Sequence, residues 1–168
     1  MNNVYATGTA PAQGDLRKAF KKVHQVALRQ KFTKVLVIED DTLTRLMLCR
    51  VLRDMGYVTI DAGNGHTGME MFRTEQPDLI VTDILMPDKE GLETIMEIRA
   101  ADADIPIVAM SGGGGMQGLS FLAMAKKFGA SRTIAKPFTP EKLEEILDSF
   151  MIGNSNPDVG LYSSFESA

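Results

Sequence analysis

Acidic, hydroxyl and amine side chains stand directly after the short apolar runs of this sequence. Three acids follow the run at 34–38 and one acid follows the run at 79–82, while a serine and a lysine end two later runs. In chain order they are Glu39–Asp41, Asp83, Ser111 and Lys136. Short runs of this kind are typical of parallel strands covered on both faces. Because such strands end at one edge of a sheet, we expect these side chains to converge there.

The expected cluster suits phosphoryl chemistry supported by a divalent cation. Adjacent carboxylates repel one another, and Mg²⁺ is a hard cation that binds a few carboxylates while keeping several waters. One carboxylate can then attack a phosphoryl group and form an aspartyl-phosphate. A lysine can stabilise the charge, and a serine hydroxyl can bond a phosphoryl oxygen. An acid triplet alone more often forms a solvated turn. Metal binding is favoured only because Asp83, Ser111 and Lys136 are expected at the same edge. Within the triplet, Asp41 is interpreted as a helix cap.

Strands and helices alternate through the body of the chain and would position these groups. The expected strands are 34–38, 57–60, 79–82, 105–110 and 132–135, and the expected helices are 42–55, 65–74, 91–99, 119–128 and 140–151. Five such units predict an α/β fold, a five-stranded parallel sheet with helices on both faces.

Two flanking segments differ from this body. Residues 1–32 form an extension with a basic amphipathic helix at about 15–31, residues 33–152 form the α/β domain, and residues 153–168 form a flexible tail. The first 34 residues hold seven Lys/Arg and one acid, whereas 35–150 hold eleven basic and nineteen acidic residues. The basic helix has three interpretations: it packs on the domain or on a second copy, it binds a partner or an anionic surface, or it is disordered when alone.

Composition excludes several classes of protein. The chain has 168 residues, of which 44% are hydrophobic, and its one cysteine, Cys49, allows no internal disulfide. No apolar run approaches the ~20 residues of a membrane span, and the first 15 residues hold no apolar signal segment. We therefore expect a cytoplasmic protein. The acidic body would repel phosphates, so we expect no direct binding of nucleic acid.

Four motifs together make the chain similar to the receiver domain of bacterial two-component response regulators. They are VLVIEDD at 35–41, DLIVTDILMP at 78–87, PIVAMSG at 106–112 and AKPF at 135–138. Each is unspecific alone, but their order and spacing fit that family over about 33–151. The resemblance implies a flavodoxin-like (βα)5 fold, which accepts a phosphoryl group from a histidine kinase or a histidine phosphotransfer protein.

The resemblance also implies roles for individual residues. Asp83 matches the phosphoacceptor, Asp40 the direct Mg²⁺ ligand, Glu39 its acidic neighbour, and Leu85 a further ligand through its backbone carbonyl. Ser111 matches the switch hydroxyl and Lys136 the phosphate-contacting lysine, followed by a cis bond to Pro137. The family usually has an aromatic residue three positions before the lysine. Here it is Thr133, so a ring that reports phosphorylation is absent.

We therefore expect a phosphorylation switch rather than an enzyme. Only about sixteen residues follow the last helix, which predicts a stand-alone receiver whose output is binding to a downstream partner protein. A homodimer through the N-terminal helix or through the fourth helix and fifth strand is also considered. One alternative is a receiver fold that binds partners without phosphorylation. Another is a Mg²⁺-dependent phosphatase of the haloacid dehalogenase type, but its Asp-x-Asp motif after the first strand is missing.

A glycine-rich stretch is the remaining motif. Residues 113–118 match G-x-G-x-x-G after a strand, as in dinucleotide-binding proteins. The stretch follows the fourth strand rather than the first, and no suitable acid follows it at the expected distance, so we do not expect dinucleotide binding.

Overall fold

The computed structural model describes residues 34–86, 91–112 and 116–152. The expected basic helix at 15–31, the expected tail at 153–168 and residues 113–115 of the glycine-rich stretch lie outside the described residues. The elements in chain order are β1 (Lys34–Ile38), α2 (Thr42–Asp54), β2 (Val58–Ala62), α3 (Gly65–Glu75), β3 (Leu79–Asp83), α4 (Gly91–Ala101), β4 (Ile107–Ser111), α5 (Met116–Lys127), β5 (Arg132–Ala135) and α6 (Pro140–Ile152).

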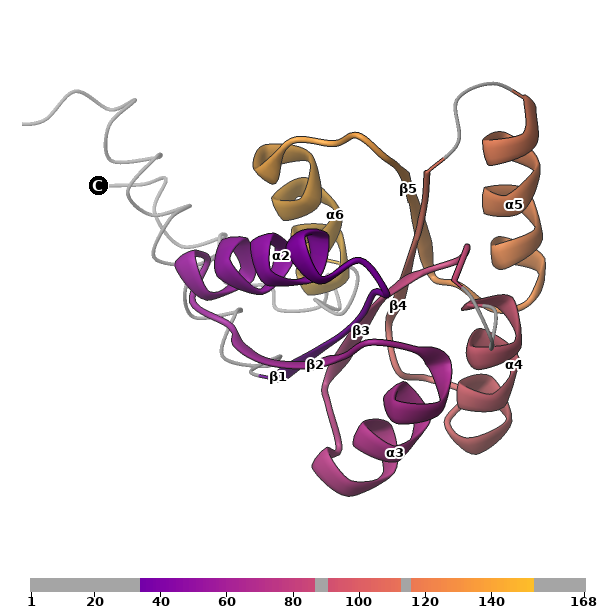
Figure 1. Cartoon of the computed structure of the whole chain (residues 1–168), viewed down its shortest axis with the longest axis horizontal. Coiled ribbons are helices and arrows are strands. Elements are labelled where there is room, and N and C mark those ends of the chain that lie inside the picture. The colour runs from indigo at the N-terminus through magenta and orange to yellow at the C-terminus, as the bar shows by residue number, and fades with distance from the viewer. Residues whose placement is uncertain (1–33, 87–90, 113–115, 153–168) are drawn as a thin grey trace, which may run out of the picture. The chain divides into compact units, whose positions relative to one another are not determined.

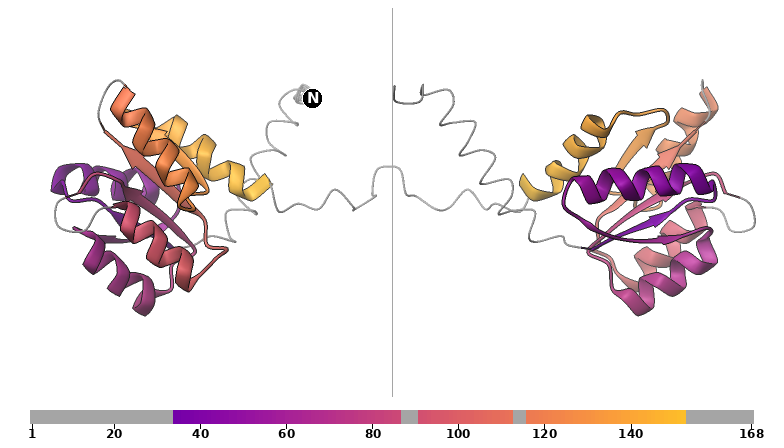
Figure 2. Two further views of the ribbon diagram at one scale, coloured as in Figure 1. Left: turned by 90° about the vertical axis from the view of Figure 1, so that its right-hand side faces the viewer. Right: turned by 60° about the vertical axis from the view of Figure 1, so that its left-hand side comes forward.

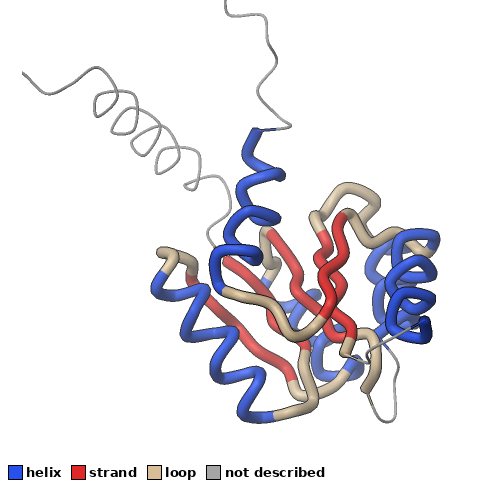
Figure 3. Tube along the Cα trace, turned by 90° about the horizontal axis from the view of Figure 1, so that it is seen from above, coloured by secondary structure: helices blue, strands red, loops and turns tan. Residues whose placement is uncertain are grey.

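The five strands form one parallel sheet in the order β2-β1-β3-β4-β5. The order reverses beside β1, because the chain adds β2 on one side of it and β3 on the other. Figure 3 shows the strands side by side between the helices. The predicted fold class is therefore confirmed, and a ligand site is expected at the carboxyl edge near the reversal between β1 and β3.

Helices cover both faces of the sheet. Figures 1 and 2 show α2 and α6 on one face and α3, α4 and α5 on the other. Beneath the second layer, Leu36, Ile80 and Ile107 of three neighbouring strands are fully buried in one apolar cluster. On the first layer, Leu52 and Leu143 are also fully buried. Burial on both faces explains why the polar residues of the central strands lie at or next to the strand ends.

Three strands differ from their sequence-based bounds: β3 extends one residue further, to Asp83, and β2 and β4 differ for local reasons. The predicted end of β2 is Ile60, but Asp61 and Ala62 continue the strand because they pair with Val37 and Ile38 of β1. β4 begins at Ile107 rather than Ile105. The strand starts one residue after Pro106, which has no backbone N–H to donate.

Side-chain caps fix the starts of two helices. The Asp41 carboxylate accepts from the Thr44 amide at 2.7 Å, and the Asn64 side chain accepts from the Thr67 amide at 2.9 Å. The interpretation of Asp41 as a cap is confirmed. Because the cap holds this carboxylate against the helix, it separates Asp41 from its two acidic neighbours. Within the described ranges, no helix has the length and apolar character required to cross a membrane.

Candidate functional site

The strand ends bring the predicted side chains to one edge of the sheet. Glu39 follows β1, Asp83 ends β3, Ser111 ends β4 and Lys136 follows β5. Register pairs Asp83 with Met110 and Ser111 with Ala135, so the four positions lie in adjacent rows. Asp83 lies next to the reversal of the strand order, where sheets of this kind hold their ligands.

Lys136 links the two buried acids of the site. Its Nζ lies 2.5 Å from Oε2 of Glu39 and 2.8 Å from Oδ2 of Asp83. The side chains of Glu39 and Asp83 are only 2% and 8% exposed, against 20% for the lysine. Two carboxylates therefore share one ammonium group in a largely dry pocket, where electrostatic interactions are strong.

The carboxylate of Asp83 is held at both oxygens. Oδ1 accepts from the Ile84 amide at 2.7 Å and, at the longer distance of 3.4 Å, from the Leu85 amide. Oδ2 accepts from Lys136. These contacts fix the orientation of the Asp83 carboxylate, and a fixed orientation favours its reaction as a nucleophile.

Three carboxylates together form a candidate cation site. Glu39, Asp40 and Asp83 each place a carboxylate oxygen within 4.8 Å of the other two. Oxygen donors with surplus negative charge are what Mg²⁺ prefers, so the residues present fit this ion. Leu85 lies two residues after Asp83 and is 40% exposed. The role of its backbone carbonyl as a metal ligand stays a prediction.

Ser111 lies beside this cluster without a bond to its carboxylates in the contacts described. The residue is 2% exposed, and its Oγ donates to the carbonyl of Gly112 at 3.2 Å. The Lys136 amide donates to the Ser111 carbonyl at 2.8 Å, and the Lys136–Pro137 peptide bond is cis, as the resemblance implies. The hydroxyl and the ammonium group are therefore carried by neighbouring strand ends.

Burial and charge perturb the two partners of the ion pair in the same direction. Burial raises the pKa of Glu39, the nearby Asp83 carboxylate raises it further, and the hydrogen bond from Lys136 only partly opposes this. Burial alone would lower the pKa of Lys136, but hydrogen bonds to Asp83 and Glu39 outweigh it and raise that pKa. The pocket thus favours protons and cations over bare carboxylates.

Sequence reasoning missed two residues that shape the site. Arg45 in the first turn of α2 bonds the backbone of the acidic loop, and only its place four residues after Asp41 hinted at this. Gly91 starts α4 against the end of β3, with its amide bonded to the Ile84 carbonyl at 2.9 Å. A Cβ at this position would overlap the Asp83 carbonyl and the Ile84 Cα, so the close approach requires glycine.

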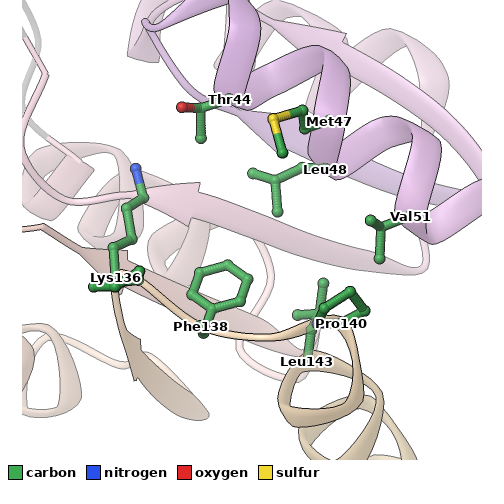
Figure 4. Close-up of a pocket in the computed structure, with 9 residues that line it drawn as sticks. Thr44, Met47, Leu48, Val51, Lys136, Phe138, Pro140 and Leu143 are labelled. Atoms are coloured by element: carbon green, nitrogen blue, oxygen red, sulfur yellow. The ribbon is translucent and has the colours of Figure 1, made fainter.

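An apolar groove runs from this site between α2 and α6. It has a volume of about 310 Å³, and its walls include Met47, Val51 and Phe138. Figure 4 shows Lys136 at one end of the groove and Val51 with Leu143 at the other. The outer surface of α2 also exposes apolar side chains; Leu43 is 72%, Leu46 56% and Met47 69% exposed.

The parallel sheet, covered by helices on both faces, makes this an α/β protein with an acid cluster and a lysine where the strand order reverses. Comparisons with known proteins identify its family. The response regulator receiver domain model matches residues 35–148. The Thermotoga maritima chemotaxis protein CheY is 33% identical over 116 residues, which cover 68% of this chain and 94% of that protein. The crystal structure of Vibrio cholerae CheY4 is 27% identical with a TM-score of 0.63, covering 70% of this chain and 98% of that one.

Longer regulators match as well. The probable C4-dicarboxylate response regulator DctR of Bacillus subtilis is 32% identical over 125 residues, 73% of this chain. The chain spans only 54% of the length of DctR, and 53% of a probable transcriptional regulator of Cyanophora paradoxa. The match therefore covers the receiver part of such proteins. This chain belongs to the response regulator receiver domain family.

Proposed function

We propose that this chain accepts a phosphoryl group on Asp83 and works as a signalling switch. The observation that carries the proposal is the setting of the Asp83 carboxylate. It is fixed by the Ile84 amide and by Lys136, and it shares a pocket with the carboxylates of Glu39 and Asp40. The phosphoryl donor would be a histidine kinase or a histidine phosphotransfer protein, as in the family.

The transfer is a single displacement at phosphorus. An oxygen of Asp83 bonds to phosphorus while the bond from phosphorus to the donor imidazole nitrogen breaks, and the imidazole leaves with that electron pair. Lys136 lies 2.8 Å from Asp83 Oδ2, so its ammonium can donate to an oxygen of the incoming group. Ser111 ends the adjacent strand, and its hydroxyl can donate to another phosphoryl oxygen.

Glu39, Asp40 and Asp83, with the backbone carbonyl of Leu85, would hold Mg²⁺ at this edge. The bound ion would supply positive charge for the phosphoryl oxygens. The observed surplus of carboxylates over cations supports this ligand set, because Lys136 is the one cation paired with Glu39 and Asp83 among the described residues. The proposed functional unit is residues 33–152, acting in the cytoplasm as a switch rather than an enzyme.

The output of the switch would be binding to a downstream partner protein. Helices α4 and α5 and the turn after α5 expose apolar side chains that support a protein contact at this face: Met96 is 43%, Leu119 66%, Met124 38% and Phe128 36% exposed. A homodimer through this face and β5 is the other arrangement we propose. Thr133 on β5 provides no aromatic ring, so Ser111 would carry the signal to this surface.

Intact-mass spectrometry with acetyl phosphate tests the proposal. We expect wild type to gain one phosphoryl group in the presence of Mg²⁺ and to lose it with hydroxylamine, which cleaves acyl phosphates. Asp83→Asn should gain none, since an amide is a poor nucleophile. Asp54→Asn is the matched control, because Asp54 is an exposed acid paired with Arg50 on α2, and it should be labelled like wild type.

Three results would contradict the proposal. Labelling that persists in Asp83→Asn would place the acceptor elsewhere. No labelling of a wild type shown by calorimetry to bind Mg²⁺, with either acetyl phosphate or a phosphorylated histidine phosphotransfer protein, would favour the phosphorylation-independent binding module. Turnover of a general phosphatase substrate would instead favour the phosphatase.

A further inference from the structure

Arg45 connects three elements around the acidic loop that follows β1. It lies in the first turn of α2, and its side chain is only 16% exposed. Nη1 donates to the carbonyl of Glu39 at 2.7 Å and to that of Asp40 at 3.3 Å. On its other side, Nε donates to Oδ2 of Asp61 on β2 at 3.0 Å. One guanidinium therefore ties the loop to α2 and to the neighbouring strand.

The targets of these bonds are informative. Arg45 binds the backbone carbonyls of the two acids and leaves their carboxylates to the pocket. The Glu39 amide donates to the Ala62 carbonyl at 3.1 Å, so the peptide units on both sides of Glu39 are held. Fixing both units fixes the direction in which the Glu39 side chain leaves the backbone. The negative charge of Asp61 offsets the guanidinium charge on the side away from the cluster.

We propose that Arg45 is a positioning residue for the cation site, which it serves by clamping the backbone that carries Glu39 and Asp40. This inference rests on the proposed Mg²⁺ site and extends it to a residue that touches no ligand oxygen. The planar guanidinium has five donors in a fixed fork, and here it bonds two carbonyls and a carboxylate together. A lysine has a single ammonium and can reach only part of this set.

Calorimetric titration with Mg²⁺ tests the clamp. Full-length Arg45→Met should bind Mg²⁺ about 10-fold more weakly than wild type, at the low end of the effect of removing outer-shell partners. Arg45→Lys should recover part of the loss. Arg50→Met is the matched control, because Arg50 is an arginine of the same helix paired only with exposed Asp54 at i,i+4 among the contacts described, and its affinity should be unchanged.

A second readout separates positioning from stability. In labelling with acetyl phosphate, Arg45→Met should need about 10-fold more Mg²⁺ for half-maximal rate, yet reach a rate within about twofold of wild type at saturation. A role only in stability would lower the melting temperature and leave the Mg²⁺ affinity of the folded protein unchanged. All titrations are made at a temperature at which circular dichroism shows each variant folded.

Asp61→Ala keeps the test decisive if Arg45→Met does not fold. Asp61 is 40% exposed and anchors the guanidinium from β2, so its removal should weaken Mg²⁺ binding by a smaller factor than loss of the arginine. Unchanged affinity in both Arg45→Lys and Asp61→Ala, with wild type binding normally, would overturn the clamp. Failure of wild type itself to bind Mg²⁺ would instead overturn the metal site of the proposed function.

Discussion

The two edges of the sheet each hold a cation among polar groups, and they are built in opposite ways. At the amino edge, Arg99 of α4 donates to neutral acceptors: the Gly129 carbonyl at 2.7 Å, the Asp102 carbonyl at 3.2 Å and Ser131 Oγ at 3.0 Å. Ser131 Oγ also accepts from the Ile107 amide at 3.2 Å. At the carboxyl edge, Lys136 instead faces two buried carboxylates with a third close by.

This difference separates a stabilising cluster from the one that we propose is functional. The guanidinium at the amino edge donates to uncharged acceptors, the carboxylates of Asp102 and Asp104 lie close enough to favour its charged form, and it joins α4 to the turn before β5. The carboxyl edge has more negative groups than the one lysine can neutralise. Stability alone would not select such a surplus, because like charges in a partly dry pocket repel. A divalent cation would use this surplus, and its charge would in turn offset that of a phosphoryl group.

The largest effect is expected at the amino edge. Arg99→Ala should lower the free energy of unfolding by about 2–3 kcal/mol, because the Gly129 carbonyl and Ser131 hydroxyl would lose a charged donor. Urea unfolding at neutral pH measures this. Arg50→Ala is the matched control, since it removes an exposed helical ion pair and should cost about 0.5 kcal/mol or less. Equal losses in the two variants would show that the Arg99 contacts are not stabilising.

A change of opposite sign is expected at the carboxyl edge. Asp40→Asn should raise the free energy of unfolding by about 1 kcal/mol in buffer with a chelator, because it removes one of three carboxylates with ligand oxygens within 4.8 Å of one another. Added Mg²⁺ should stabilise wild type and have little effect on the variant. The same urea assay measures both. A loss of stability in Asp40→Asn would show that its charge is compensated and that no surplus exists.

The part of the site that could be predicted from the sequence is the part carried by the ends of the strands. Val35–Ile38 and Leu79–Val81 are short apolar runs, and the ends of both strands lie within one residue of those predicted from the sequence. The positions of Glu39 and Asp83 at those ends are enough to predict that the two acids lie together, whereas Lys136 is placed by its motif. Local sequence is sufficient here because one parallel sheet aligns all strand ends at the same edge.

Contacts between distant elements could not be predicted in this way. Beyond its place four residues after Asp41, nothing in the local sequence distinguishes Arg45 from other arginines on the surface of a helix, because its partner Asp61 lies 16 residues away on β2. Gly91 is required by the close approach of α4 to β3, which depends on tertiary packing and leaves no local pattern. β2 extends past its predicted end for the same reason: pairing with β1 outweighs the low strand propensity of Asp61.

The smallest expected effect is a response to salt, and it tests the comparison without a metal. Raising NaCl from 0.1 M to 1 M shortens the screening length from about 10 Å to about 3 Å. Repulsion at the carboxyl edge should weaken, so wild type should gain a few tenths of a kcal/mol in unfolding free energy beyond the gain of Asp40→Asn. The hydrogen-bond acceptors of Arg99 are neutral, but Asp102 and Asp104 attract its charge, so Arg99→Ala should gain slightly more from added salt than wild type. Comparing variants in the same salt cancels its general effect on burial. An identical response of all three proteins would mean that charge at the carboxyl edge is already screened by water, and that the contrast between the edges lies in hydrogen bonding alone.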